Sequence, residues 1–168
     1  MTATVVSLSD PIHASAGPAV PVLSAVPLGD SPALELVLSA ALDSVPAADG
    51  AADGVLVALE GWTGDGPPPE VARVVDRLGR SCLRGRPVGM IALSADLTKA
   101  ARALAWLRGA VRGHGGLPVG VGISVDAAEF VAVGSGWEFA DITLPASLAL
   151  LGRRVRALAW SRRILSSV

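Results

Sequence analysis

Residues 52–67 read ADGVLVALEGWTGDGP, and the rest of the chain can be arranged around them. Residues 55–59 are apolar without polar alternation, which is typical of a strand buried on both faces of a parallel sheet. The run ends in a glycine-rich loop, and three prolines then introduce a helix. Because ligands bind at the carboxyl ends of strands in open α/β sheets, we expect any functional site to include this loop.

Composition limits the classes of protein to which the chain can belong. Its 168 residues suit a single domain over 1–168, and 51% apolar against 17% charged residues indicates a globular protein that covers surface by association. The net charge of −1 gives no reason to expect nucleic acid binding. The lone Cys82, the absence of a basic segment before the first apolar stretch and the absence of a long apolar run together predict a cytoplasmic protein without a membrane span.

Charge is distributed unevenly along the chain. No Lys or Arg precedes Arg73, whereas nine of the fifteen acidic residues do. This asymmetry predicts either regions of opposite charge that orient a partner or simply a solvated arginine-rich surface. The arginine-rich last helix is a candidate for binding an acidic surface, including that of a second copy.

Strand and helix patterns alternate, which predicts an α/β fold with a parallel sheet. The interval 9–19 is short for a crossover, so we expect the first helix to be shortened or missing. Residues 126–142 are expected to form a long connection. The predicted strands are 4–8, 20–26, 55–59, 88–93 and 117–125, and the predicted helices begin near 31, 68, 97 and 143.

Four segments carry a resemblance to a known family. They are Ala52–Val57, similar to an "ADALVV" strand; Leu83–Val88, similar to "L-x-G-K-P-V"; Trp106–Arg108 with Gly115–Val119, similar to "QLRPLL…GA-x-V-V-P"; and Ala140-Asp141, similar to "AD…L". In this order they resemble the NAD(P)H-dependent FMN reductases, which are flavodoxin-like flavoproteins. The resemblance implies a three-layer sandwich with a five-stranded parallel sheet in the order 2-1-3-4-5.

The resemblance also implies an FMN site made by three loops. Its residues here would be Ser9 and Ser15 in the first loop, Trp62, Thr63 and Gly64 in the second, and Ser94 in the third. Each loop departs from the family pattern. Asp10 brings negative charge to the phosphate position, and Pro11 removes a backbone donor. We therefore expect a degenerate FMN site.

Other side chains near the central loop have two interpretations each. Glu60 and Asp65 are candidates for acid–base chemistry, or are carboxylates that simply reach solvent. Trp62 is a shelf for a planar ligand or a plug that fills the vacated flavin pocket, and we expect the plug. Trp106 lies off the leucine stripe of its helix, and we expect it to anchor an interface rather than to pack under the 130–139 loop. Paired Cys and His ligands are absent, so no metal is expected.

Two functions compete at this point. The first is a non-catalytic or accessory subunit that associates with itself or with an intact flavin reductase relative. The alternative is an active NAD(P)H-dependent FMN oxidoreductase that binds flavin with help from a partner, or an enzyme that reuses the same crevice for other chemistry.

Overall fold

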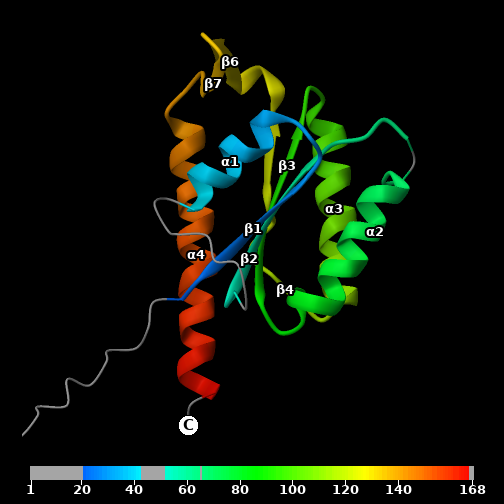
Figure 1. Cartoon of the computed structure of the whole chain (residues 1–168), viewed down its shortest axis with the longest axis vertical. Coiled ribbons are helices and arrows are strands. Elements are labelled where there is room, and N and C mark those ends of the chain that lie inside the picture. Colours follow the sequence, from blue (N-terminus) through cyan, green and yellow to red (C-terminus); the bar gives the residue numbers. More distant parts are fainter. Residues whose placement is uncertain (1–20, 43–51, 65, 167–168) are drawn as a thin grey trace, which may run out of the picture.

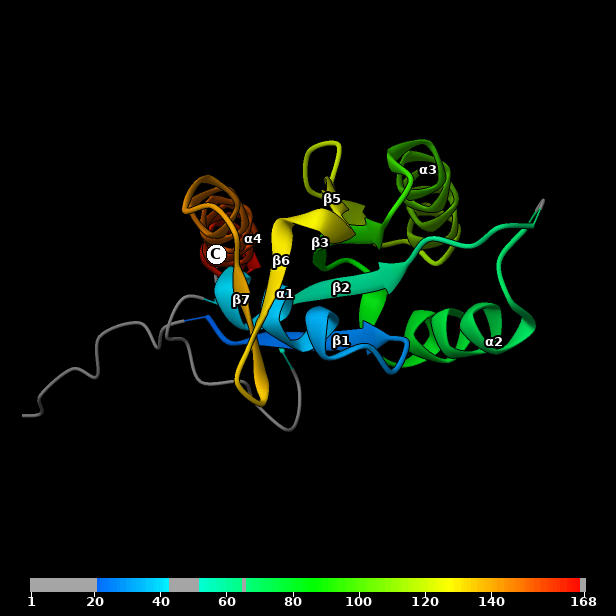
Figure 2. The ribbon, with the colours of Figure 1, turned by 90° about the horizontal axis from the view of Figure 1, so that it is seen from above.

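The computed structural model describes residues 21–42, 52–64 and 66–166. A twisted sheet forms the middle of three layers (Figure 1). Seen from above, helices α1 (Pro32–Leu42) and α4 (Thr143–Ser166) cover one face, whereas α2 (Pro69–Leu78) and α3 (Leu97–Gly113) cover the other (Figure 2). None of the described helices combines the length and the apolar character needed to cross a membrane.

The sheet contains five strands, and every pairing in it is parallel. Strand β1 (Leu23–Leu28) pairs with β2 (Gly54–Glu60), and β2 pairs with β3 (Pro87–Ser94). Beyond β3 lie β4 (Leu117–Pro118) and β5 (Ile123–Asp126), which both pair with β3. The predicted α/β class, with a five-stranded parallel sheet and flanking helices, is confirmed.

The assignment of segments to the 2-1-3-4-5 order was wrong in one respect. That order placed residues 4–8 between the strand predicted at 20–26 and the central strand. Instead, Leu23–Leu28 pairs directly with Gly54–Glu60, from Leu23 opposite Gly54 to Leu28 opposite Leu59. The fifth described strand arises because the segment predicted as one strand at 117–125 is split in two. The predicted strand at 4–8 and the crossover at 9–19 lie outside the described residues.

The central strand is buried as predicted, since every residue from Val55 to Leu59 is at most 1% exposed. Its side chains alternate between the two faces of the sheet. Leu56 and Ala58 belong to the apolar cluster with α1 and α4, whereas Val55, Val57 and Leu59 pack with α2 and α3. A strand with an apolar layer on each face has no need for polar alternation, which explains the uninterrupted run.

Helix α4 lies close to the sheet and to α1 because glycines face it. A Cβ atom on Gly54 or Gly89 would come within 2.8 Å of the side chain of Val155. Where α4 crosses α1, a Cβ on Gly152 would overlap the backbone carbonyl of Ala41. Side chains at these positions would therefore force α4 away from both neighbours.

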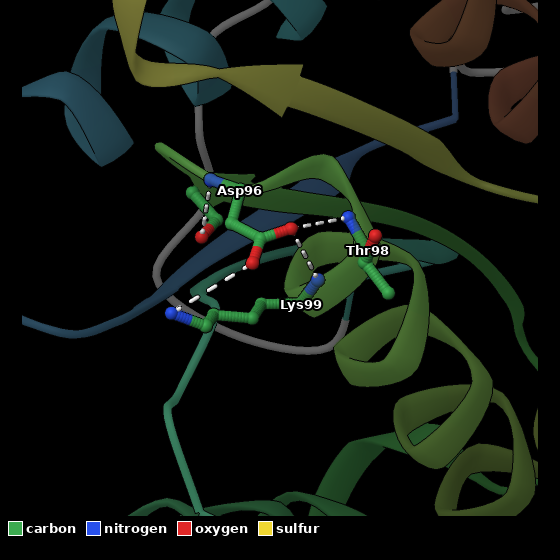
Figure 3. A network of polar contacts seen from close by, with 4 residues as sticks. Asp96, Thr98 and Lys99 are labelled. Atoms are coloured by element: carbon green, nitrogen blue, oxygen red, sulfur yellow. Dashed lines mark hydrogen bonds and ion pairs between the residues drawn. The ribbon is translucent and has the colours of Figure 1, made fainter.

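Helices α1 and α3 each begin with a side-chain cap, at Ser31 as predicted and at Asp96, which the sequence analysis does not name. The Ser31 hydroxyl accepts a hydrogen bond from the backbone N–H of Ala33 at 3.3 Å. One Asp96 carboxylate oxygen accepts from the N–H groups of Thr98 and Lys99 at 2.8 and 3.4 Å (Figure 3). The bond from Thr98 is the main reason that the pKa of Asp96 lies below its ordinary value.

Two features of the second half differ from the predictions. Residues 126–142 contain a short helix (Ala127–Glu129) and an antiparallel hairpin of β6 (Phe130–Val133) and β7 (Gly136–Phe139), rather than a plain connection. Gly134, with φ of 60°, makes the tight turn of the hairpin. Gly120 and Gly122 also have positive φ and separate β4 from β5, so they set the backbone conformation of the edge strand.

Candidate functional site

Two clefts open at the carboxyl edge of the sheet. The larger encloses about 600 Å³ between the loop after β1, the loop after β2 and helix α2. The smaller encloses about 280 Å³ between the loops after β2 and β3 and the β6–β7 hairpin. Pro27, Leu28, Gly29, Asp30, Ser31, Glu60, Gly61, Trp62, Pro68, Glu70, Val71 and Val74 line the larger cleft. Ser31, Ala33, Glu60, Gly61, Leu93, Ser94, Ala95, Ala127, Phe130 and Trp137 line the smaller one.

The clefts share Ser31, Glu60 and Gly61. The N–H of Gly61 donates to the carbonyl of Leu93 at 2.7 Å, which ties the end of β2 to the end of β3. A Cβ on Gly61 would lie 2.9 Å from the Cβ of Ser94, so only glycine allows this close approach. The side chain of Glu60 lies beside Gly29, on which a Cβ would be 3.4 Å from the Glu60 carboxyl carbon. Glu60 thus stands on the ridge between the two clefts.

Only some of the site residues proposed from the sequence line the two clefts. Trp62 lines the larger cleft, Ser94 lines the smaller, and Glu60 lines both. Thr63 and Gly64 are exposed and line neither cleft. The other three proposed residues, Ser9, Ser15 and Asp65, lie outside the described residues. The roles proposed for these side chains stay predictions.

Trp62 forms part of the wall of the larger cleft. The expectation that it plugs the vacated flavin pocket stays a prediction, because that pocket was defined in part by the loop after residue 8, which lies outside the described residues. The Trp62 ring meets that of Trp106 edge to face, with centroids 5.5 Å apart and an interplanar angle of 85°. Both rings are partly buried against the apolar cluster formed with α2 and α3. Trp106 therefore supports Trp62 within the chain, a role that neither sequence interpretation had given it.

Sequence reasoning missed Asp30, Ser31 and Trp137 as cleft residues. Residues 29–31 form the loop between β1 and α1, at the carboxyl end of a strand that pairs with β2. A Ser-Pro helix start directly after an apolar strand was a usable signal for this loop. Trp137 comes from the β6–β7 hairpin, which the sequence analysis had not predicted.

The charged side chains that line the larger cleft in the described part of the chain are all acidic. Asp30, Glu60 and Glu70 line it, and no Lys or Arg among the described residues lines either cleft. All three carboxylate residues are exposed, and within the described part of the chain none has a hydrogen-bond or ion-pair partner for its side chain. The cleft therefore presents a negative electrostatic potential to any ligand.

These residues do not fit the phosphate of FMN. A dianion at the start of α1 would need several N–H or O–H donors. Pro32 has no N–H, Ser31 contributes a single hydroxyl, and Asp30 places a second negative charge in the same loop. No group of three or more potential metal ligands occurs among the described residues.

Comparison with known proteins identifies the fold. No family model and no curated protein matches the chain. Solved structures do match it, among them the following two. A short-chain flavodoxin associated with a non-canonical PDU bacterial microcompartment has a TM-score of 0.59 and 13% identity, over 82% of this chain and 99% of that one. A flavodoxin WrbA-like protein from Agrobacterium tumefaciens has a TM-score of 0.55 and 18% identity, over 85% and 99%. The chain therefore has a flavodoxin-like fold.

Proposed function

We propose that this protein is a flavodoxin-fold accessory subunit whose FMN site has degenerated and which acts by associating with itself or with an intact flavin-binding relative. The observation that carries the proposal is the chemistry of the larger cleft, which Asp30, Glu60 and Glu70 line without any Lys or Arg among the described residues. We infer that a flavin phosphate would have to bind beside these carboxylates, at the start of α1. A flavin phosphate needs N–H or O–H donors around it, and the three carboxylates here would oppose its binding.

Exposed apolar side chains support the association. Most of the large ones in the described residues lie on the β6–β7 hairpin, on α4 or on the segment between them. We infer that they contribute to a surface that a partner could cover, which would require them to form a contiguous apolar patch. They are Val131, Val133, Trp137, Ile142, Leu150, Leu158, Ile164 and Leu165.

The first experiment is the absorbance spectrum of freshly purified protein, combined with sedimentation velocity. The proposal predicts no visible flavin absorbance and a species larger than a monomer, either alone or with a flavoprotein relative. The two arms can fail separately. Bound flavin would overturn the degenerate site, and a monomer that binds no relative would overturn the accessory role.

A second function, flavin binding with help from a partner, is favoured by one observation. Trp62 and Trp137 line the two adjoining clefts and offer aromatic surfaces to a flat ring. This function would be the conclusion if the isolated chain is colourless but a complex with its partner contains one flavin for each copy of this chain.

A further inference from the structure

We propose that the larger cleft binds a small organic cation, that is, an ammonium or guanidinium group carried on an apolar body. This inference rests on the proposed function, because it assigns a ligand class to the same site once the flavin phosphate is excluded. Four features carry it: the volume of the cleft, its apolar wall, its aromatic face and its unpaired carboxylates.

The cleft suits a small molecule in size and lining. Its volume of about 600 Å³ lies within the range of small-molecule sites. Leu28, Val71 and Val74 supply apolar surface, and Trp62 supplies a ring whose position is fixed by its contact with Trp106. Apolar burial would therefore hold the body of the ligand.

The charges determine what the head of the ligand must be. Asp30, Glu60 and Glu70 line the same cleft on three different elements, and the described residues provide no counter-ion for any of them. These carboxylates would attract a cation and repel an anion. An ammonium or guanidinium group can also lie over the Trp62 ring in a cation–π contact.

Of the three carboxylates, we expect Glu60 to contribute most to the affinity for a cation. It lies on the ridge between the clefts, beside Gly29, and is held there at the end of a fully buried strand. Helix α1 carries another exposed carboxylate, Glu35, which lines neither cleft. Glu60→Gln and Glu35→Gln therefore remove the same charge from inside and outside the proposed site.

The test compares three probes of similar shape by calorimetry at low ionic strength: phenethylammonium, phenethyl alcohol and hydrocinnamate. We expect phenethylammonium to bind about tenfold more tightly than the neutral alcohol, and hydrocinnamate to bind least. Added salt should weaken the binding of the ammonium and leave that of the alcohol unchanged. Equal affinities for the three probes, or no binding of the ammonium, would overturn the proposal.

Variants then locate the site. Glu60→Gln should weaken phenethylammonium about fivefold, and Trp62→Leu should weaken it about two- to fivefold. Glu35→Gln should leave the affinity unchanged, and urea unfolding of each variant confirms that it is folded. Equal losses in Glu60→Gln and Glu35→Gln would place binding elsewhere and overturn the proposal.

A parallel titration with FMN separates this inference from the proposed function. Absence of both FMN and ammonium binding would refute the cation site and leave the degenerate flavin site standing. Tight FMN binding would refute the degenerate site, on which the cation proposal rests.

Discussion

The two edges of the sheet use their carboxylates differently. At the amino edge, Asp53 is 18% exposed, accepts a hydrogen bond from the N–H of Val22 at 2.9 Å and pairs with the Nε of Arg163 at 3.0 Å. At the carboxyl edge, Asp30, Glu60 and Glu70 are exposed and have no partner within the described residues. Asp53 therefore connects α4 to the amino edge of the sheet. The three acidic residues at the carboxyl edge connect no two elements within the described part of the chain.

This difference distinguishes a carboxylate that contributes to the stability of the fold from carboxylates that are available to bind a ligand. A carboxylate with an N–H donor and a cationic partner stabilises the folded state, because both interactions are lost on unfolding. Asp30, Glu60 and Glu70 have no partner among the described residues, so no such interaction is lost on unfolding. The acidic character of Asp30, Glu60 and Glu70 is therefore better explained by a ligand than by the fold. Four predictions test this division, beginning with the packing that supports both edges.

The largest effect is expected where α4 crosses α1. Gly152→Ala would place a methyl group against the carbonyl of Ala41, and we expect a loss of about 3 kcal/mol in the free energy of unfolding. Gly109→Ala is the matched control, because this α3 glycine is exposed and a Cβ there would contact nothing within 4 Å. It should raise stability by about 0.5–1 kcal/mol, since alanine favours the helix. Urea unfolding measures both, and equal changes would contradict the α1–α4 crossing.

The next effect compares the two edges directly. Asp53→Asn removes the charge that faces Arg163, and we expect a loss of about 1–2 kcal/mol. Glu60→Gln removes a charge with no partner in the described chain, so stability should change by no more than about 0.5 kcal/mol. Thermal and urea unfolding of the pair are sufficient. A loss in Glu60→Gln as large as that in Asp53→Asn would show that the carboxyl-edge acids are structural.

Asp96 provides a third comparison, because it lies at the carboxyl edge but accepts hydrogen bonds from Thr98 and Lys99. Its hydrogen bond from Thr98 lowers its pKa below the ordinary 3.8. Because the pKa of Asp96 is lower in the folded than in the unfolded state, the ionised carboxylate stabilises the fold at pH values above the unfolded-state pKa. This stabilisation is lost as the pH falls through the folded-state pKa. Asp96→Asn keeps an N-cap acceptor that does not titrate. The stability of the wild type relative to this variant should therefore fall in acid, and a constant difference from neutral pH to acid would contradict the cap.

Local sequence patterns predicted much of the frame and little of the site. The uninterrupted apolar run at Val55–Leu59 and the cap at Ser31 depend on near neighbours in the chain, so they could be recognised. Strand order depends on which segments meet in space, and an apolar strand at 20–26 carries no mark of its partner. Trp137 reaches the smaller cleft through the β6–β7 hairpin, whose turn signal, Gly134-Ser135, had been taken for part of a loop.

A calorimetric titration of the purified protein with FMN tests the central claim, that the carboxyl edge rejects the flavin phosphate. We expect no saturable heat up to about 100 μM FMN, and weak binding to become detectable only after the opposing charge is removed in Asp30→Asn. Stoichiometric binding of FMN to the wild-type chain at micromolar or lower concentration would contradict the account.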